Sequence, residues 1–299
     1  MATLKGQNLR IFVDNKHIAL SQSCTVTLNS NTEESGSKED VDGAARPEIV
    51  SKGWSVNVDS LSVMDIGRII SVAKSMKPVT VAWDETTGTS NSTPIKSTFA
   101  RTGSAYINDL NFSFNNRANS TKSIQLAGTG ELKKVTSTFN PSGTDEIGFT
   151  KGQFIRLFLS KEELSGFSVL AAAKNLSFHL SISLETNTTK DTTGDWIVQE
   201  PTGYSYDISS NALVRSGEKI EEGAEAALSY EDIEEIYKNS KAVSFEIANT
   251  HGANNREMLE PILEGEVIIT QLTLTASNKS AVTYDTQMQG YGELFVIEN

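Results

Sequence analysis

Apolar and polar residues alternate through most of this chain, and the alternation predicts β-strands. Between residues 24 and 29, the apolar Cys24, Val26 and Leu28 are separated by polar residues. Successive side chains of a strand point to opposite faces, so this pattern places one face against a core and the other in water. The same pattern predicts strands near residues 9–14, 24–30, 54–59, 79–83, 104–114 and 121–127, and again near 154–159, 177–184, 204–209, 243–248, 266–275 and 282–289.

Two short helices interrupt the predicted strands, at residues 63–75 and 230–239. Each begins with Ser-x-x-Asp, starting at Ser62 and at Ser229. This is a variant of the capping box, in which the serine oxygen accepts a hydrogen bond from an unpaired amide and the acid lies near the positive end of the helix dipole. The first helix is expected to end before Pro78, because the residue ahead of a proline resists the α conformation.

An internal repeat organises the whole sequence. Residues 5–13 recur as residues 151–159, at an offset of 146 and with every apolar position kept apolar. The other matches are residues 26–32 with 182–188, 53–58 with 203–208, 62–69 with 229–236 and 103–132 with 265–294, at offsets of 156, 150, 167 and 162. Five blocks in the same order indicate duplication of one domain. We therefore expect a first copy at residues 1–132, a linker at 133–150 and a second copy at 151–299.

Length and composition agree with two globular domains. The chain has 299 residues, of which 37% are hydrophobic and 21% are charged. At roughly 150 residues per domain, each copy is large enough to bury its own core. We expect two tandem β-sandwich or partly open barrel domains, each with one short α-helix packed on it.

The net charge of -12 disfavours tight binding of nucleic acid, which requires cations against the phosphates. The charge is unevenly placed, because residues 1–150 sum to 0 and residues 151–299 sum to -12. Residues 218–235 hold eight acids against one base. Such a run is typical of a solvated surface, and a contact with a basic partner is the alternative.

Cys24 is the single cysteine, so no intramolecular disulfide can form. The first residues lack the apolar run of a signal peptide, and no stretch approaches the 18 consecutive apolar residues typical of a membrane-spanning helix. These features predict folding in a reducing cytoplasm, with no membrane as a partner.

The sequence offers no catalytic, cofactor-binding or metal-binding set, and we expect none. The three histidines, His17, His179 and His251, lie in unlike contexts, and no His-x-x-x-His or Cys-x-x-Cys spacing is present. Residues 203–207 resemble a nucleophile elbow but lack its second glycine, and they are expected to form a strand entry. The acidic residues 33–43 do not fit an EF-hand, because a lysine stands where an oxygen ligand is needed.

Glycines and tryptophans also have structural interpretations. Gly128-Thr129-Gly130 and Gly290-Tyr291-Gly292 complete no phosphate-binding motif, so they are expected to allow a bend or a close backbone approach at the end of a strand. Trp54, Trp83 and Trp196 occur singly. We expect core or rim positions for them and no stacking platform for bases or sugars.

Taken together, these blocks resemble the tail tube, or major tail, proteins of long-tailed bacteriophages. In the first copy the likeness lies in the strand at residues 53–59, the capped helix from Ser62 and the closing strand pair that ends at residues 128–132. In the second copy it lies in Gly203-Tyr204-Ser205, residues 229–236 and residues 290–294. The chain departs from many members of the family in having two tube domains.

The resemblance implies a structural virion protein without an active site. Members of the family polymerise into stacked rings of six tube domains, whose sheets join into one barrel around the lumen through which viral DNA leaves the capsid. The implied partners are other copies of the chain and the tape-measure, tail-terminator and baseplate proteins, and assembly would take place in the host bacterial cytoplasm. With four strands per domain, the barrel would have about 24 strands and be roughly 45 Å wide, so DNA would pass without specific binding.

Two features of the implied assembly stay open at this stage. Three chains could place their two domains side by side in a pseudo-hexameric ring, which we prefer, or six chains could contribute to two stacked rings. The polar residues 29–50 are too long for a tight hairpin. The family suggests that they form a loop that reaches neighbouring subunits, mobile in the free protein and ordered in the tube.

Other functions compete with this interpretation. The tube protein of a contractile injection system would have the same architecture. A β-sandwich that binds glycans or host cells is the main rival from another class, although the chain has no aromatic cluster for sugars. An enzyme ranks third because the catalytic inventory is so poor.

Overall fold

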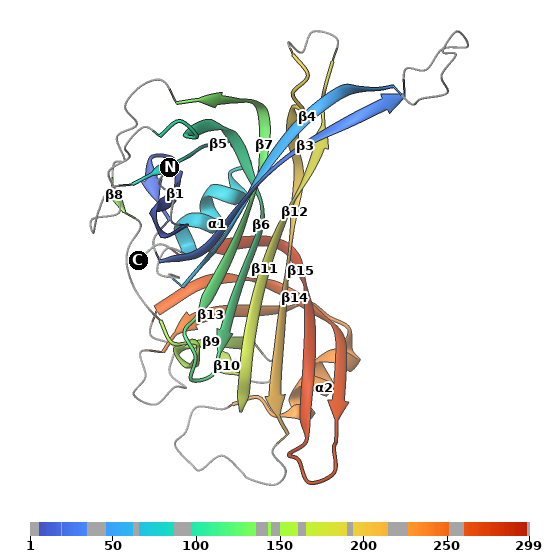
Figure 1. Ribbon diagram of the computed structural model, residues 1–299. Coiled ribbons are helices and arrows are strands. Elements are labelled where there is room, and N and C mark those ends of the chain that lie inside the picture. Colours follow the sequence, from blue (N-terminus) through green and yellow to red (C-terminus); the bar gives the residue numbers. More distant parts are fainter. Residues whose placement is uncertain are drawn as a thin grey trace.

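The computed structural model describes residues 6–18, 20–34, 46–61, 66–86, 97–135, 143–144, 150–160, 166–189, 194–214, 227–250 and 260–297. Figure 1 labels the elements within these ranges. In this part of the chain no helix is long and apolar enough to span a membrane.

Strands make up most of both halves. The first half contains η1 (Gly6–Asn8), β1 (Leu9–Val13), β2 (Lys16–His17), β3 (Ser21–Glu34), β4 (Pro47–Ser60), α1 (Ile66–Lys74), β5 (Val79–Glu85), β6 (Arg101–Asn115), β7 (Thr121–Lys134) and β8 (Gly143–Thr144). The second half contains η2 (Gly152–Phe154), β9 (Ile155–Ser160), β10 (Phe167–Val169), β11 (Ala173–Thr186), β12 (Gln199–Leu213), α2 (Tyr230–Asn239), β13 (Val243–Asn249), β14 (Glu260–Thr275) and β15 (Thr283–Val296). The chain is mainly β, as the alternation predicts.

The two halves pair their strands in the same order. That order is β2-β1-β5-β6-β7-β4-β3 in the first half and β10-β9-β13-β14-β15-β12-β11 in the second. The halves join because β6 also pairs with β11, in antiparallel register. The result is a continuous layer of eight strands, β3-β4-β7-β6-β11-β12-β15-β14, which we call the long sheet (Figure 1).

β-Bulges recur at matching positions in the two halves. The β6–β7 pair shifts register between Thr102 and Ser104, and the β14–β15 pair does so between Glu264 and Glu266, 162 residues further along the chain. A second shift, between Ile107 and Asp109, recurs between Ile269 and Gln271 at the same offset. The bulges therefore reproduce the offset of 162 found in the sequence.

The repeat offsets expected for β3 and β4 are wrong. Their register shifts at Ser21/Ser23 and Asn31/Thr32 recur in the β11–β12 pair at Ala173/Asn175 and Ser183/Leu184, an offset of 152. The sequence matches at 156 and 150 are thus displaced by four and two residues. A displacement by an even number keeps every side chain on its own face, which is why alternation did not reveal it.

The helices need a similar correction. Each is followed by one residue with left-handed backbone, Met76 (φ 51°) after α1 and Ser240 (φ 51°) after α2. Three residues later each chain segment enters β5 or β13, so the helices correspond at an offset of 164 and not at 167. The capping box at Ser229 is present as predicted. Ser62, the predicted cap of the first helix, lies outside the described residues.

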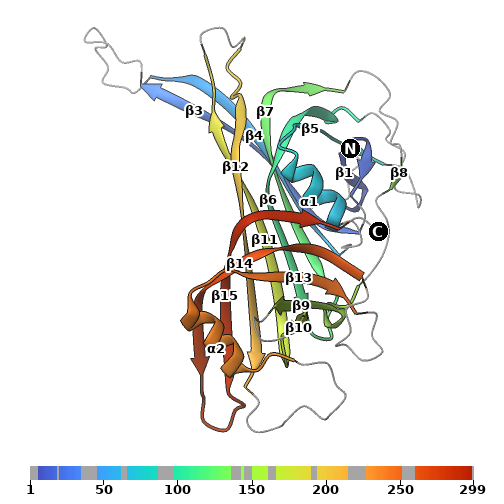
Figure 2. The same cartoon turned by 180° about the vertical axis from the view of Figure 1, so that it is seen from behind.

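One hydrophobic core extends across both halves. Figure 2 shows α1 and α2 in front of the long sheet, on the face opposite to that seen in Figure 1. Aromatic side chains cross the junction, because the ring of Phe178 lies 6.4 Å from that of Phe112 and 6.3 Å from that of Tyr206. The ring of Phe245 lies 6.0 Å from Tyr206. This continuous packing fixes the two halves side by side.

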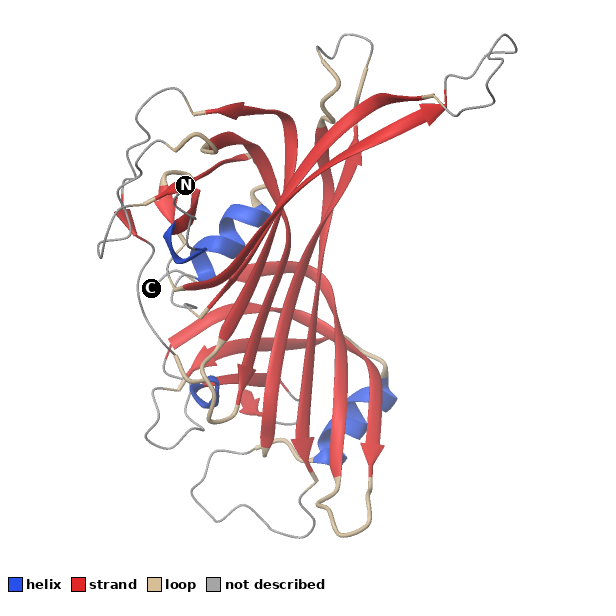
Figure 3. Ribbon diagram, in the orientation of Figure 1, coloured by secondary structure: helices blue, strands red, loops and turns tan. Residues whose placement is uncertain are grey.

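Several strands are longer than the alternation predicts (Figure 3). The expectation of a loop at residues 29–50 is wrong at both ends, since β3 continues to Glu34 and β4 begins at Pro47. These ends are exposed on both faces, so they have no burial pattern to reveal them. Within the expected linker, Gly143–Thr144 pairs in parallel with β2.

Candidate functional site

The seam between the halves is formed by the second part of β6 and the first part of β11. Asn115 lies opposite Asn175 at one end of this pairing and Asp109 lies opposite Ser181 at the other. On the core side, Leu110 is paired with Leu180 and Phe112 with Phe178. All four of these apolar side chains are buried. The seam is therefore part of the core and not a loose contact between domains.

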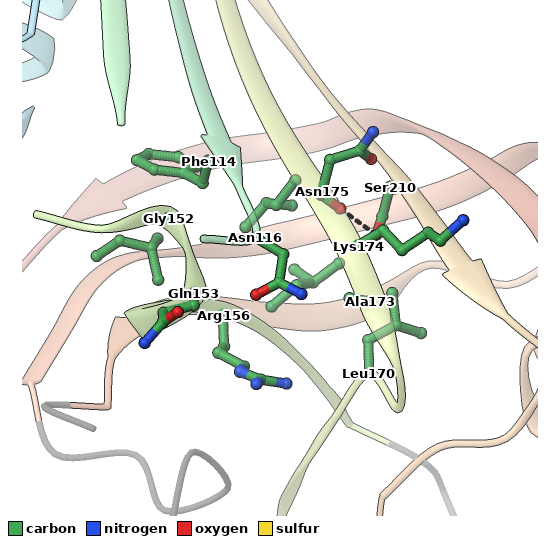
Figure 4. A pocket seen from close by; sticks show the side chains of 13 residues that line it. Phe114, Asn116, Gly152, Gln153, Arg156, Leu170, Ala173, Lys174, Asn175 and Ser210 are labelled. Atoms are coloured by element: carbon green, nitrogen blue, oxygen red, sulfur yellow. Dashed lines mark hydrogen bonds between the residues drawn. The ribbon is translucent and has the colours of Figure 1, made fainter. Parts of the chain in front are cut away.

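At the Asn115–Asn175 end of the seam, η2 packs against the backbone of β6. A Cβ at Gly152 would lie 2.4 Å from the backbone nitrogen of Asn115, so only glycine allows this approach. The amide of Asn116 donates a hydrogen bond of 2.9 Å to the carbonyl of Lys174. Figure 4 shows the small hollow beside these residues, which is lined from both halves and holds a hydrogen bond from Ser210 Oγ to the carbonyl of Asn175.

The two outer edges of the long sheet lack a second neighbouring strand among the described residues. Along β3, the described partner is β4 alone, and residues 271–275 of β14 pair only with β15. Leu28 is 65% exposed, whereas its counterpart Leu180 is 0% exposed. Leu274 is 52% exposed, whereas its counterpart Phe112 is 0% exposed.

Gly152 and Gly6 are a third pair in which the residue at the seam is packed and its counterpart at the outer edge is exposed. Gly152 is packed against the backbone of β6, but a Cβ at Gly6, which lies at the same place in the first half, would meet nothing within 4 Å. Exposed apolar side chains on unpaired strand edges are sites at which another strand can add. The outer edges, β3 and the end of β14, thus correspond to the two strands β11 and β6 that pair in the seam. We call these two unpaired edges the open seam.

The face of the long sheet that points away from the core is covered with small polar side chains. Its middle positions are Ser23, Thr25 and Thr27 on β3, Ser55, Asn57 and Asp59 on β4, Ser123 and Gln125 on β7, Asp109, Asn111 and Ser113 on β6, Ser177, His179 and Ser181 on β11, Ser205, Asp207 and Ser209 on β12, Asp285, Gln287 and Gln289 on β15, and Gln271, Thr273 and Thr275 on β14. We call this surface the polar face. Its ionisable side chains are four aspartates and one histidine, and these positions include no lysine or arginine.

His179 bridges two of these aspartates across the seam. Its Nε2 lies 2.8 Å from Asp109 Oδ2 on β6, and its Nδ1 lies 2.6 Å from Asp207 Oδ2 on β12. Burial lowers the pKa of His179, but the hydrogen bonds and charges of the two aspartates outweigh that effect, so the pKa is raised above its usual 6.5. The counterparts of His179, Asp109 and Asp207 are the uncharged Thr27 and Gln271, on the two outer strands, and Ser55 on β4.

We expect the His179 bridge to stabilise the seam most at low pH. A histidine whose pKa is raised by folding contributes its full stabilisation below the unfolded pKa of about 6.5, and the contribution is lost as the pH rises through the folded pKa. The free energy of unfolding of the parent chain should exceed that of His179→Gln below pH 6.5, and the difference should shrink as the pH rises. Urea unfolding at a series of pH values measures both, and parallel pH profiles would contradict the bridge.

The remaining histidines form no site in the described residues. His17 is buried beside Phe12, and burial and the charge of Arg10 lower its pKa to about 4, so it is neutral at pH 7. His251 lies outside the described residues, as do residues 35–43 of the acidic loop. Among the described residues, no group of three His, Cys, Asp or Glu side chains could hold a metal ion.

The other sequence candidates have structural roles. Residues 203–207 lie inside β12 and not at a strand entry, which excludes a strand-to-helix elbow. Trp54 and Trp83 are buried with their rings 6.2 Å apart, and Trp196 is half-buried beside β4. The prediction of core and rim positions for the tryptophans is confirmed.

The paired glycines allow a close approach and a bend, as predicted. A Cβ at Gly128 would lie 2.2 Å from Trp54, and one at Gly290 would lie 2.6 Å from Tyr206. Gly130 and Gly292 have left-handed backbone, with φ of 72° and 74°. Trp54 and Tyr206 are therefore equivalent residues, which is further evidence for the offset of 152.

Several solved structures are similar to this chain over about half of its length. The chain is similar to the tail of an empty gene transfer agent particle refined with C6 symmetry, at 15% identity and a TM-score of 0.39, over 50% of this chain and 99% of the other. It is also similar to the virion of the native gene transfer agent, at 15% identity and a TM-score of 0.38, over 50% and 99%. A third similar structure is the SPP1 tail tube, at 18% identity and a TM-score of 0.37, over 49% and 78%.

No protein-family profile matches the sequence, and no curated protein matches it either.

Proposed function

We propose that this chain is a structural tube protein, which closes into rings through β3 and β14 and stacks into a phage-type tail tube for the passage of viral DNA. The observation that carries the proposal is the open seam. Inside the chain, β6 and β11 bury Phe112 and Leu180, while the corresponding side chains on β14 and β3 are exposed. A second copy of the chain supplies the complementary edge in each direction.

The internal seam defines the register between chains. Transferring the β6–β11 pairs by the two offsets places Leu28 opposite Leu272 and Val26 opposite Leu274 of the next chain. On the polar face the same register places Thr27 opposite Thr273. Both faces of the new pairing match, because apolar side chains meet on the core side and hydroxyl groups meet on the other.

We infer that residues 1–132 and 151–299 are two copies of one unit, joined by residues 133–150. The common strand order and the recurring bulges support this inference. Because the units lie side by side in one sheet, three chains supply six units to a ring, and the head-to-tail seam closes when the sixth unit meets the first. Two stacked rings of six chains would instead need the two units of each chain to lie one above the other.

A ring of three chains has a lumen suited to passive transit of DNA. Each long sheet provides eight strands, so three chains provide about 24, and at ~4.8 Å per strand the closed sheet is roughly 45 Å across its backbone. The helices and the core lie on one face of the long sheet (Figure 2). In a closed ring with the helices outside, the polar face would therefore line the lumen. Aspartates without lysines or arginines cannot hold phosphates, so a duplex would slide past without being bound. Chemistry is not required of this chain, and we propose that it is not an enzyme.

Electron microscopy of the purified chain at high concentration tests the proposal. We expect rings and tubes with six similar units around the axis, modulated with threefold symmetry. Density with strict sixfold symmetry would overturn the three-chain ring. Dispersed monomers that bind a glycan array would overturn the tube and favour a host-binding β-sandwich.

A further inference from the structure

The helix α1 binds the second half of its own chain. A Cβ at Gly67 would lie 3.0 Å from Cγ1 of Val296, at the end of β15. Lys74 Nζ donates a hydrogen bond to the carbonyl of Leu294 and lies 5.6 Å from the ring centre of Tyr204 and 5.9 Å from that of Phe295. The surface that receives α1 is therefore largely apolar and aromatic, with Glu293 as its acid, 3.7 Å from Lys74 Nζ.

The matching face of α2 has no such cover. At the offset of 164, Gly67 corresponds to Glu231, Ile70 to Glu234 and Ala73 to Tyr237. Ile70 and Ala73 are buried, whereas Glu231 is exposed and Tyr237 is 43% exposed. The face of α2 formed by Glu231, Glu234 and Tyr237, which we call the α2 face, is thus the counterpart of an occupied interface.

The surface that α1 contacts also has a counterpart, in the first half of the chain, and its residues differ in charge. At the offsets of β12 and β15, Tyr204 corresponds to Lys52, Phe295 to Lys133 and Val296 to Lys134. Lysines thus take the places of these three apolar or aromatic residues in the first half. Lys133 and Lys134 are exposed at the end of β7.

We propose that the α2 face of one chain binds the end of β7 of the next chain, with Glu231 beside Lys134. This inference rests on the proposed ring, because the ring gives adjacent chains the same relation as the two halves within a chain. Charge complementarity identifies the occupant: acids replace Gly67 and Ile70 on the helix, and lysines replace Phe295 and Val296 on the sheet. A second copy of this chain presents that basic surface at the required place.

The interface explains part of the acidic segment that distinguishes the second half. Lys238, the counterpart of Lys74, pairs with Glu234 at 3.0 Å. The contacts of Lys74 with Glu293, Tyr204 and Phe295 place Lys238 near Glu131, Lys52 and Lys133 of the next chain, so Glu234 and Glu131 would separate the lysines there. The interface between the units of one chain is largely apolar, while the more ionic interface between chains would be weakened by salt. The charges also favour a contact between the second half of one chain and the first half of the next. If α2 met the second half of another chain instead, its acids would face Tyr204 and Phe295, which supply no cation.

Reversal of charge tests the contact in the full-length chain. We expect Glu231→Lys with Glu234→Lys to raise the protein concentration needed for ring formation about tenfold, from like-charge contacts at exposed positions. Lys133→Glu with Lys134→Glu should have the same effect, although it shifts the net charge in the opposite direction. The chain with all four substitutions should assemble within about threefold of the parent concentration. Assembly unaffected by either pair, or no recovery in the fourfold variant, would overturn the contact.

Cysteine cross-linking locates the contact directly, in a Cys24→Ser background. Gly67→Cys with Val296→Cys is the matched control and should form a disulfide within one chain, since the two positions are adjacent. Glu231→Cys with Lys134→Cys should form disulfides between chains, giving a ladder that ends at three chains. If the control forms and assembled rings of the second variant do not cross-link, the contact is wrong. A parent chain that never assembles would instead refute the proposed function.

Discussion

Leu28→Asp is expected to abolish ring formation while leaving the single chain folded. Leu28 is 65% exposed, so a carboxylate there stays in water until a second chain approaches. In the ring it would lie opposite Leu272 of the next chain, where an unpaired charge in an apolar contact costs several kcal/mol. Sedimentation velocity should show monomers at concentrations at which the parent forms rings, and thermal unfolding should be unchanged within a few degrees.

The matched control for Leu28→Asp is Leu180→Asp, at the corresponding position of the internal seam. Leu180 is 0% exposed, so its substitution should unfold the chain and not merely prevent assembly. Leu274→Asp, on the other edge, should behave like Leu28→Asp. Normal rings from Leu28→Asp would show that β3 is not part of the contact between chains.

Gly128→Ala is expected to destabilise the fold by about 3 kcal/mol. A Cβ there would lie 2.2 Å from Cε2 of the buried Trp54, and overpacking of a core typically costs 1–3 kcal/mol and sometimes more. Gly290→Ala should act likewise through Tyr206. Urea unfolding measures both effects.

Gly130→Ala is the control for Gly128→Ala, because nothing lies within 4 Å of a Cβ at Gly130 and only its left-handed backbone (φ 72°) is strained. It should cost about 1 kcal/mol. In a Trp54→Leu background, Gly128→Ala should cost less than in the parent chain, since the smaller side chain leaves room for the new methyl group. Equal effects at Gly128 and Gly130 would exclude the packing of Trp54 as the cause.

Local sequence patterns predict the longer elements but not the short strands β2, β8 and β10. Alternation located the strands that have one buried face, and the capping box at Ser229 located α2. The repeat of residues 103–132 at 265–294 was found with its true offset, because this segment has no insertions and carries the glycines that contact Trp54 and Tyr206.

The offset of β12 could not be found in the same way. Gly-Trp-Ser at residues 53–55 matches Gly-Tyr-Ser at 203–205 in letters, yet the structural counterpart of Trp54 is Tyr206. Tyr204 and Tyr206 lie on the same face of one strand, so alternation fits both. Only the contact with Gly290 and the pairing with β11 distinguish them.

The open seam was also beyond reach of the sequence alone. Leu28 and Leu180 have the same residue type in the same alternating pattern, and their burial differs because one strand has a neighbour and the other does not. Neighbours that are distant in sequence leave no local signal. The strand ends near Glu34 and Pro47 were missed for the related reason that neither of their faces is buried.

A high-resolution reconstruction of the assembled chain is the most direct test of the proposed ring. We expect three chains per ring, a continuous sheet around the lumen, and β3 of each chain paired with β14 of the next so that Leu28 lies opposite Leu272. A ring in which β3 and β14 remain unpaired, or in which chains meet through other elements, would contradict the account.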